Sequence, residues 1–230
     1  MKLYSGNSQD IPAEGQPEEV SSALLDSQLQ AIQERLRETP PAAQAELRLE
    51  AARTLLRLDR KEEAWEEARQ AFDAAVAAAQ WESAVEACEA LFLTEQPESL
   101  AALGQGIWLA VTFPIDPGIT IEMLRRVVEE TPDDSDGAAV AAATAYYVAD
   151  VRAEGKDREN YRFYAGQMLS SVARRHSQVE GQEQFDAWME RLELYQPEQF
   201  LVRLRNVVDV LVQDEWWIDR DAIHAQIPDH

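Results

Sequence analysis

Cysteine, glycine and proline are scarce in this chain of 230 residues, and each shortage excludes a class of structure. A single cysteine excludes an intramolecular disulfide framework and any cysteine-rich zinc module. Nine glycines and ten prolines disfavour turn-rich sandwiches, barrels and collagen-like chains. The longest apolar stretch, 99–113, is shorter than the roughly 20 residues of a membrane span. It predicts a buried helix instead.

Positive charge is also in short supply. The chain has 21 basic and 43 acidic residues, which gives a formal net charge of −22. Phosphate backbones and anionic membranes repel such a polyanion, so we expect neither nucleic acid nor membrane as a partner. Residues 1–18 contain no apolar run of the length that a signal peptide needs, and we expect a cytoplasmic protein.

Hydrophobic residues make up 46% of the chain, enough for a core, and they recur at helical spacing. No stretch has the β-branched alternation typical of a strand. The pattern predicts an all-α fold of about ten antiparallel helices, stacked as hairpins, with a compact helical bundle as the alternative. The predicted helices are 20–36, 42–58, 61–79, one from 81, 99–113, 119–130, 137–153, 158–175, 180–194 and 197–213.

The same pattern divides the chain into three parts. Residues 1–18 have no periodicity and are predicted to be a flexible leader. A single helical domain follows over 19–213. The remainder, 214–230, is a tail that contains two adjacent tryptophans, which must either fold back onto the last helices or dock onto something else.

Alanines and leucines in the first half fall at the spacings of a known helical repeat. These residues are Ala51, Ala52, Leu55, Ala64, Ala68 and Ala71, and the segment 59–65 has the turn and second-helix start that go with them. Partial matches follow at Leu124, Val127 and Pro132, and at 155–164. In these features the chain resembles a degenerate tetratricopeptide repeat protein over about 120 residues. The resemblance implies helical hairpins that stack side by side.

The chain departs from the tetratricopeptide pattern in two respects. The equivalent positions Ala64, Thr120 and Asn160 are further apart than the family's repeat of about 34 residues. Arg48 and Ala52 stand where the family has tryptophan and glycine. The family's peptide-clamp residues have no counterpart here, so the resemblance does not by itself imply peptide binding.

No catalytic constellation is recognisable, and we predict no enzyme activity, no cofactor and no metal site. Gly104 and Gly106 lack the lysine of a phosphate loop and favour close helix–helix approach. Gln105 between them needs a hydrogen-bond partner if it is buried. Cys88 lies on an apolar face and has no histidine nearby in the sequence, so it is predicted to be a small core residue. The acidic run 133–137 fails the calcium-loop pattern and is expected to cap a helix.

Candidate binding residues are therefore aromatic and arginine side chains. Tyrosine offers an apolar ring with a polar tip, arginine pairs with carboxylates, and tryptophan is a frequent anchor at protein interfaces. The candidates are Tyr146, Tyr147, Tyr161, Tyr164, Arg125, Arg126, Arg174, Arg175, Trp216, Trp217 and Ile218. Core packing for the tyrosines and surface ion pairs for the arginines remain the alternatives.

Two functions follow as expectations. The first is a protein–protein interaction module, such as an adaptor, an assembly factor or chaperone, or an accessory subunit, that grips another protein with a basic patch. The second is a helical bundle that senses a small molecule or cofactor around Gln105 and Trp108. A less favoured third is mimicry of nucleic acid, against which the interleaving of arginine with the acidic residues counts. The oligomeric state is not predicted.

Overall fold

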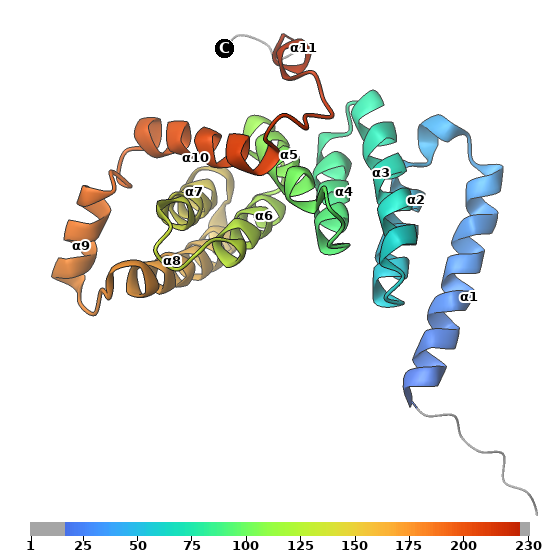
Figure 1. Ribbon diagram of the computed structural model, residues 1–230, viewed down its shortest axis with the longest axis horizontal. Coiled ribbons are helices and arrows are strands. Elements are labelled where there is room, and N and C mark those ends of the chain that lie inside the picture. Colours follow the sequence, from blue (N-terminus) through green and yellow to red (C-terminus); the bar gives the residue numbers. More distant parts are fainter. Residues whose placement is uncertain (1–16, 226–230) are drawn as a thin grey trace, which may run out of the picture.

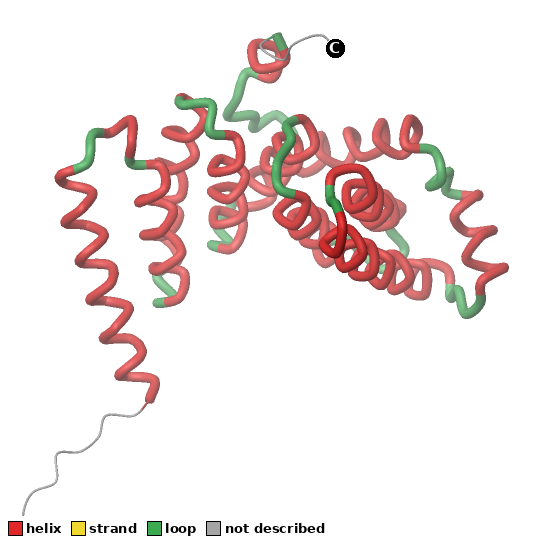
Figure 2. Tube along the Cα trace, turned by 180° about the vertical axis from the view of Figure 1, so that it is seen from behind, coloured by secondary structure: helices red, strands yellow, loops and turns green. Residues whose placement is uncertain are grey.

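The structure is a computed structural model that describes residues 17–225 and is all-helical over that range, which confirms the predicted fold class (Figures 1 and 2). The α-helices are α1 (Pro17–Glu38), α2 (Ala45–Arg57), α3 (Lys61–Ala77), α4 (Trp81–Leu93), α5 (Ser99–Thr112), α6 (Pro117–Glu130), α7 (Asp136–Arg152), α8 (Gly155–Ser177), α9 (Gln182–Arg191), α10 (Pro197–Val212) and α11 (Arg220–His224). A 3₁₀-helix, η1 (Pro41–Ala43), precedes α2. The ten predicted ranges correspond to α1–α10, whereas α11 lies in the predicted tail.

The predicted leader 1–18 falls largely outside the described residues. Pro17 and Glu18 already belong to α1, so the helical part begins slightly earlier than expected. The end of the predicted tail, 226–230, also lies outside the described residues. None of the described helices combines the length and the apolar character that crossing a bilayer requires.

Successive helices pair as hairpins in the first part of the chain. The strongest pairings are α2 with α3, α4 with α5, and α6 with α7. The first helix of each hairpin also contacts the first helix of the next: α2 contacts α4, α4 contacts α6, and α6 contacts α8. These four helices therefore share one face of the stack. At the N-terminal end, α1 packs against α2 (Figure 1).

The C-terminal helices depart from this simple stack. After α9 at the end of the molecule, α10 runs back and packs across both α5 and α7 (Figure 1). The chain is therefore a row of hairpins at one end and a closed helical cluster at the other. The fold-back covers α5 and α7 on a side that their neighbours in sequence leave open.

Both α5 and α7 need that cover because they are apolar on nearly all sides. In α5 every residue from 101 to 107 is buried, which confirms the buried helix predicted for 99–113. In α7 the alanine-rich stretch 138–145 is buried throughout. Such helices belong in the core of a domain, whereas an amphipathic helix packs with one face only.

Glycines let the neighbours approach α5 closely, as predicted. A Cβ atom on Gly104 would lie 2.5 Å from Val212 Cγ2 of α10. A Cβ atom on Gly106 would lie 2.7 Å from Cys88 Cβ of α4. Real Cβ atoms do not come this close to other heavy atoms, so both glycines are required by packing.

Polar side chains define several helix ends. Ser135 caps α7 by accepting a hydrogen bond from the Gly137 N–H, so the predicted capping segment does cap this helix. Arg152 of α7 donates to the carbonyl oxygens of Ala110 and Val111 at 2.7 and 2.8 Å. These two bonds satisfy carbonyl groups at the end of α5 that have no partner within that helix.

Candidate functional site

A groove of about 600 Å³ runs between α1, α2 and α4. Its apolar floor includes Ile32 and Leu49, both buried. Charged and polar side chains make up most of the remainder. The lining residues are Gln28, Ala31, Ile32, Arg35, Glu46, Leu49, Glu50, Arg53, Thr54, Arg57, Glu82, Ser83 and Glu86.

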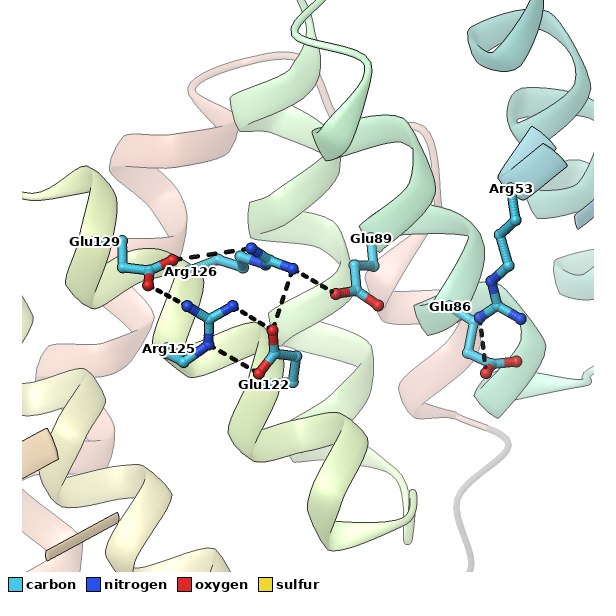
Figure 3. Close-up of polar contacts among 7 residues, drawn as sticks. All are labelled: Arg53, Glu86, Glu89, Glu122, Arg125, Arg126 and Glu129. Carbon is cyan, nitrogen blue, oxygen red and sulfur yellow. Dashed lines mark hydrogen bonds and ion pairs between the residues drawn. The ribbon is translucent and has the colours of Figure 1, made fainter. Parts of the chain in front are cut away.

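Ion pairs link the helices along this side of the molecule. Arg53 of α2 pairs with Glu86 of α4 at 2.9 Å, and Arg126 of α6 pairs with Glu89 of α4 at 3.2 Å (Figure 3). Because α2, α4 and α6 contact one another in order, these pairs run from one hairpin to the next. We call the groove lining, together with Glu89, Glu122, Arg125, Arg126 and Glu129, the groove face.

The α6 part of the groove face is a dense charge network. Arg125 donates from Nε to Glu122 at 2.8 Å and also contacts Glu129, while Arg126 reaches Glu122 at 3.1 Å (Figure 3). The hydrogen bond from Arg125 lowers the pKa of Glu122 and raises the pKa of Arg125 itself. Arg125 and Arg126 therefore form ion pairs with glutamates of this chain. Such surface ion pairs were the alternative to partner binding for these arginines.

The α8 tyrosines lie next to α6. Tyr164 is 44% exposed and close enough to Arg125 to contribute to the raised pKa of that guanidinium. The Tyr161 hydroxyl lies at the start of α6, where a Cβ on Gly118 would meet it at 2.7 Å. Burial and then the Asp116 carboxylate raise the pKa of Tyr161. Tyr164 thus borders the groove face, and Tyr161 packs against the beginning of α6.

The doubled arginine of α8 has two different environments. Arg175 donates to the Val128 carbonyl at 2.6 Å and pairs with Asp133 at 3.6 Å, so it joins α8 to the end of α6. Its neighbour Arg174 is exposed. The structure therefore separates these two candidates.

The tail folds back onto the helices. Trp217 packs edge-on against Trp65 and Phe72 of α3, with ring centroids 6.0 and 5.5 Å away, and Ile218 is buried. Trp216 packs against Trp108 of α5 with centroids 6.2 Å apart. Of the two arrangements considered for the tail, folding back onto the helices or docking onto another molecule, the structure has the first.

Gln105 has the partner that its burial demands. It is fully buried, and its Oε1 accepts a hydrogen bond from the backbone N–H of Trp217 at 2.8 Å. Trp108 packs against Trp216 and also against His224, with centroids 5.5 Å apart in the latter pair. Residues of the tail thus occupy the place where the alternative prediction put a ligand.

Tyr146 and Tyr147 lie apart from the other tyrosines. Both belong to α7, and they line a separate pocket that also involves α8, α9 and α10. The sequence leaves both core packing and a binding surface on α7 and α8 open for the four tyrosines. The structure divides these residues between two sides of the cluster.

Sequence reasoning missed the glutamates of the groove face. Glu122 and Glu129 stand three and four residues from Arg125, a spacing typical of ion pairs on one helix, and could have been found. The pairing of Glu86 and Glu89 with arginines of other helices has no local signal. It depends on how the hairpins stack.

Neither a metal site nor an activated nucleophile is evident between residues 17 and 225. The described residues contain no group of histidine, cysteine and acidic side chains that could hold a metal ion. Cys88 is fully buried, and burial raises the pKa of its thiol, as expected for a core residue. Comparison of the chain with protein-family models, with curated proteins and with solved structures gives no match.

Proposed function

We propose that the chain is a non-enzymatic interaction module that holds a segment of another protein along the groove face. The observation that carries the proposal is the groove itself. It is open, it lies beside α1, and charged side chains of both signs from α1, α2 and α4 line it. Stacked helical hairpins use extended surfaces of this kind for binding.

The resemblance to tetratricopeptide repeats supports the same proposal. The helices α2, α4, α6 and α8 share one face, and the groove opens beside the first two of them. Roles that fit such a module are an adaptor, an assembly factor or chaperone, or an accessory subunit. We propose the cytoplasm as its compartment.

Charge defines the kind of partner. With a net charge of −22, the protein attracts a basic segment over distances near the Debye length, about 8 Å at physiological salt. Glu46 and Arg57 line the groove without an ion pair among the described residues, and they then favour a segment that carries complementary charges. Association with this partner should weaken as salt rises.

Site-directed photo-crosslinking tests the proposal. A photo-reactive amino acid at Arg57, which lines the groove, should crosslink one protein in the native lysate, to be identified by mass spectrometry. The same amino acid at Glu66, exposed on α3 and outside the groove, is the matched control. Glu86→Lys should reduce the Arg57 crosslink. Equal crosslinking at both positions, or at neither, would contradict the groove as a binding site.

A further inference from the structure

A pocket of about 490 Å³ lies between the end of α4, the turn that follows it and the end of α6. We call it the turn pocket. Its apolar wall consists of Phe92, Leu93, Pro97 and Leu100. Leu93 and Leu100 are 37% and 46% exposed, so this wall keeps apolar surface in contact with water. Neighbouring exposed apolar side chains with charged residues at their rim are typical of a surface that another molecule covers.

The turn pocket continues the groove face along α4. Glu82 and Glu86 line the groove, and Leu93, seven residues after Glu86, lines the turn pocket. Residues four and seven positions apart lie on the same side of a helix. Between the two, Glu89 of α4 pairs with Arg126 of α6 at 3.2 Å, and Arg126 itself lines the turn pocket (Figure 3). One surface therefore runs from the groove to the turn pocket.

Carboxylates outnumber guanidinium groups in the part of this surface that α4 and α6 form. Arg126 is shared by three glutamates at 3.1–3.8 Å, and they are Glu89, Glu122 and Glu129. Arg125 pairs with two of the same three, Glu122 and Glu129. Glu130, which also lines the turn pocket, is exposed and forms no ion pair within the described part of the chain. The excess charge is therefore negative, and it favours a basic group on the partner.

The helix α4 sets the spacing of the apolar and the acidic contact. Glu89 and Leu93 are four residues apart, which corresponds to about 6 Å along a helix. An extended segment advances about 3.3 Å per residue and points every second side chain to the same side. An extended segment that runs along α4 therefore meets these two residues with side chains two positions apart.

We propose that the partner segment held along the groove face is extended and carries an apolar residue for the turn pocket, with a lysine or arginine two positions away beside Glu89. The inference rests on the proposed function, because it specifies the segment that the groove face holds. It assigns the choice of that segment to a pocket outside the groove between α1, α2 and α4.

Three peptides with blocked ends test the two contacts. Lys-Ser-Leu-Ser-Lys has lysines two positions from the leucine in either chain direction. Ser-Lys-Leu-Lys-Ser has the same composition with adjacent lysines, and Lys-Ser-Ala-Ser-Lys lacks the large apolar side chain. Calorimetry and ligand-observed NMR on the full chain should give a dissociation constant of about 0.1–1 mM for the first peptide. We expect the other two to bind at least about five-fold more weakly, because each loses one of the two contacts.

Two matched substitutions test the location. Leu100→Gln removes apolar surface from the turn pocket, so it should weaken the first peptide about five-fold and leave the alanine peptide unchanged. Val202→Gln is the control, since Val202 is 61% exposed on α10 and lines neither the groove nor the turn pocket. Glu130→Lys should weaken both peptides, because it reverses a charge that no arginine of the described residues neutralises. Circular dichroism of each variant confirms that the helices are intact.

Four results would overturn the proposal. Equal binding of the leucine and alanine peptides would remove the turn pocket as a contact. Equal binding of the two leucine peptides would remove the spacing. An equal loss for Leu100→Gln and Val202→Gln, or no binding of any peptide at millimolar concentration, would remove the site. The photo-crosslink from Arg57 reports on the groove separately, so a crosslink that persists in any of these cases leaves the groove proposal standing.

Discussion

The two ends of the molecule bury their apolar surface in different ways. At the N-terminal end, α1 packs against α2, and its apolar face forms a separate cluster around Leu29, Ile32 and Leu55. Further along the chain, α5 and α7 are covered by neighbours in sequence and also by the returning α10. An amphipathic helix needs a neighbour on one face, whereas a helix that is apolar all round needs neighbours on every side.

This difference should appear in local stability. In a row of hairpins each unit depends on its nearest neighbours, so the terminal unit can open by itself. The C-terminal cluster is tied together by contacts between helices far apart in sequence and should open as one unit. The tail joins the two ends, because Trp217 contacts α3 through its ring and α5 through its backbone.

The largest change in the free energy of unfolding is expected when the contacts of Trp217 with α3 are removed. Trp217→Ala deletes the ring that packs against Trp65 and Phe72, and should lower the free energy of unfolding by about 3 kcal/mol. Trp217→Phe should recover part of this loss, because an aromatic ring remains. Urea denaturation measures both variants. An unchanged midpoint for Trp217→Ala would show that the tail adds nothing to the stability of either end.

A core substitution in α1 should show whether the two ends of the molecule unfold independently. Ile32→Ala removes buried methyl groups from the small cluster, and we expect a loss of about 2–3 kcal/mol that is confined to the docking of α1. Amide hydrogen exchange should accelerate in α1 and stay unchanged in α5 and α7. Leu124→Ala, in the main core, is the comparison and should accelerate exchange throughout the cluster. If Ile32→Ala also speeds exchange in α5 and α7, the chain is one cooperative unit.

Two glycine-to-alanine substitutions sharpen the account of the C-terminal cluster. Gly104→Ala forces a methyl group against Val212 of α10 and should cost about 1–3 kcal/mol. Gly166→Ala meets ordinary contact distances and should instead stabilise the protein by about 0.5–1 kcal/mol. Thermal unfolding compares the two. If both substitutions shifted the melting temperature in the same direction, the close approach of α10 to α5 would not be what makes alanine unfavourable at position 104.

The smallest change in stability is expected from breaking an ion pair on the groove face. The folded-state pKa of Glu122 is lowered by Arg125, so the pair stabilises the protein above the unfolded pKa of about 4.3 and loses this contribution as the pH falls further. Glu122→Gln should cost about 0.5 kcal/mol at pH 7, since the pair is partly exposed. The difference from the wild type should shrink below pH 4.

Glu130→Gln is the control for that substitution. Glu130 is exposed on the same helix and forms no ion pair among the described residues. Its substitution should leave the pH profile of stability as it is in the wild type. A pH-independent loss for Glu122→Gln would contradict the role of the Arg125 pair.

Much of the local structure could be predicted because its causes lie close together in sequence. Helical spacing of apolar residues located ten helices, and Ser135 caps α7 from within the predicted capping run. The candidate sites were harder, because a surface is assembled from several helices. Tyr161 and Tyr164 lie near α6, whereas Tyr146 and Tyr147 face the pocket beside α9 and α10. Spacing along one helix cannot show which neighbour each face meets.

By itself the sequence determined the helical class, the buried character of α5 and the need of Gln105 for a partner. The tertiary structure decided that this partner is the Trp217 N–H, and that α10 is the helix that Gly104 admits. The physical reason is the range of the interactions. Helix formation and capping act over a few residues, whereas the burial of an all-round apolar helix is completed by whichever distant segment packs against it.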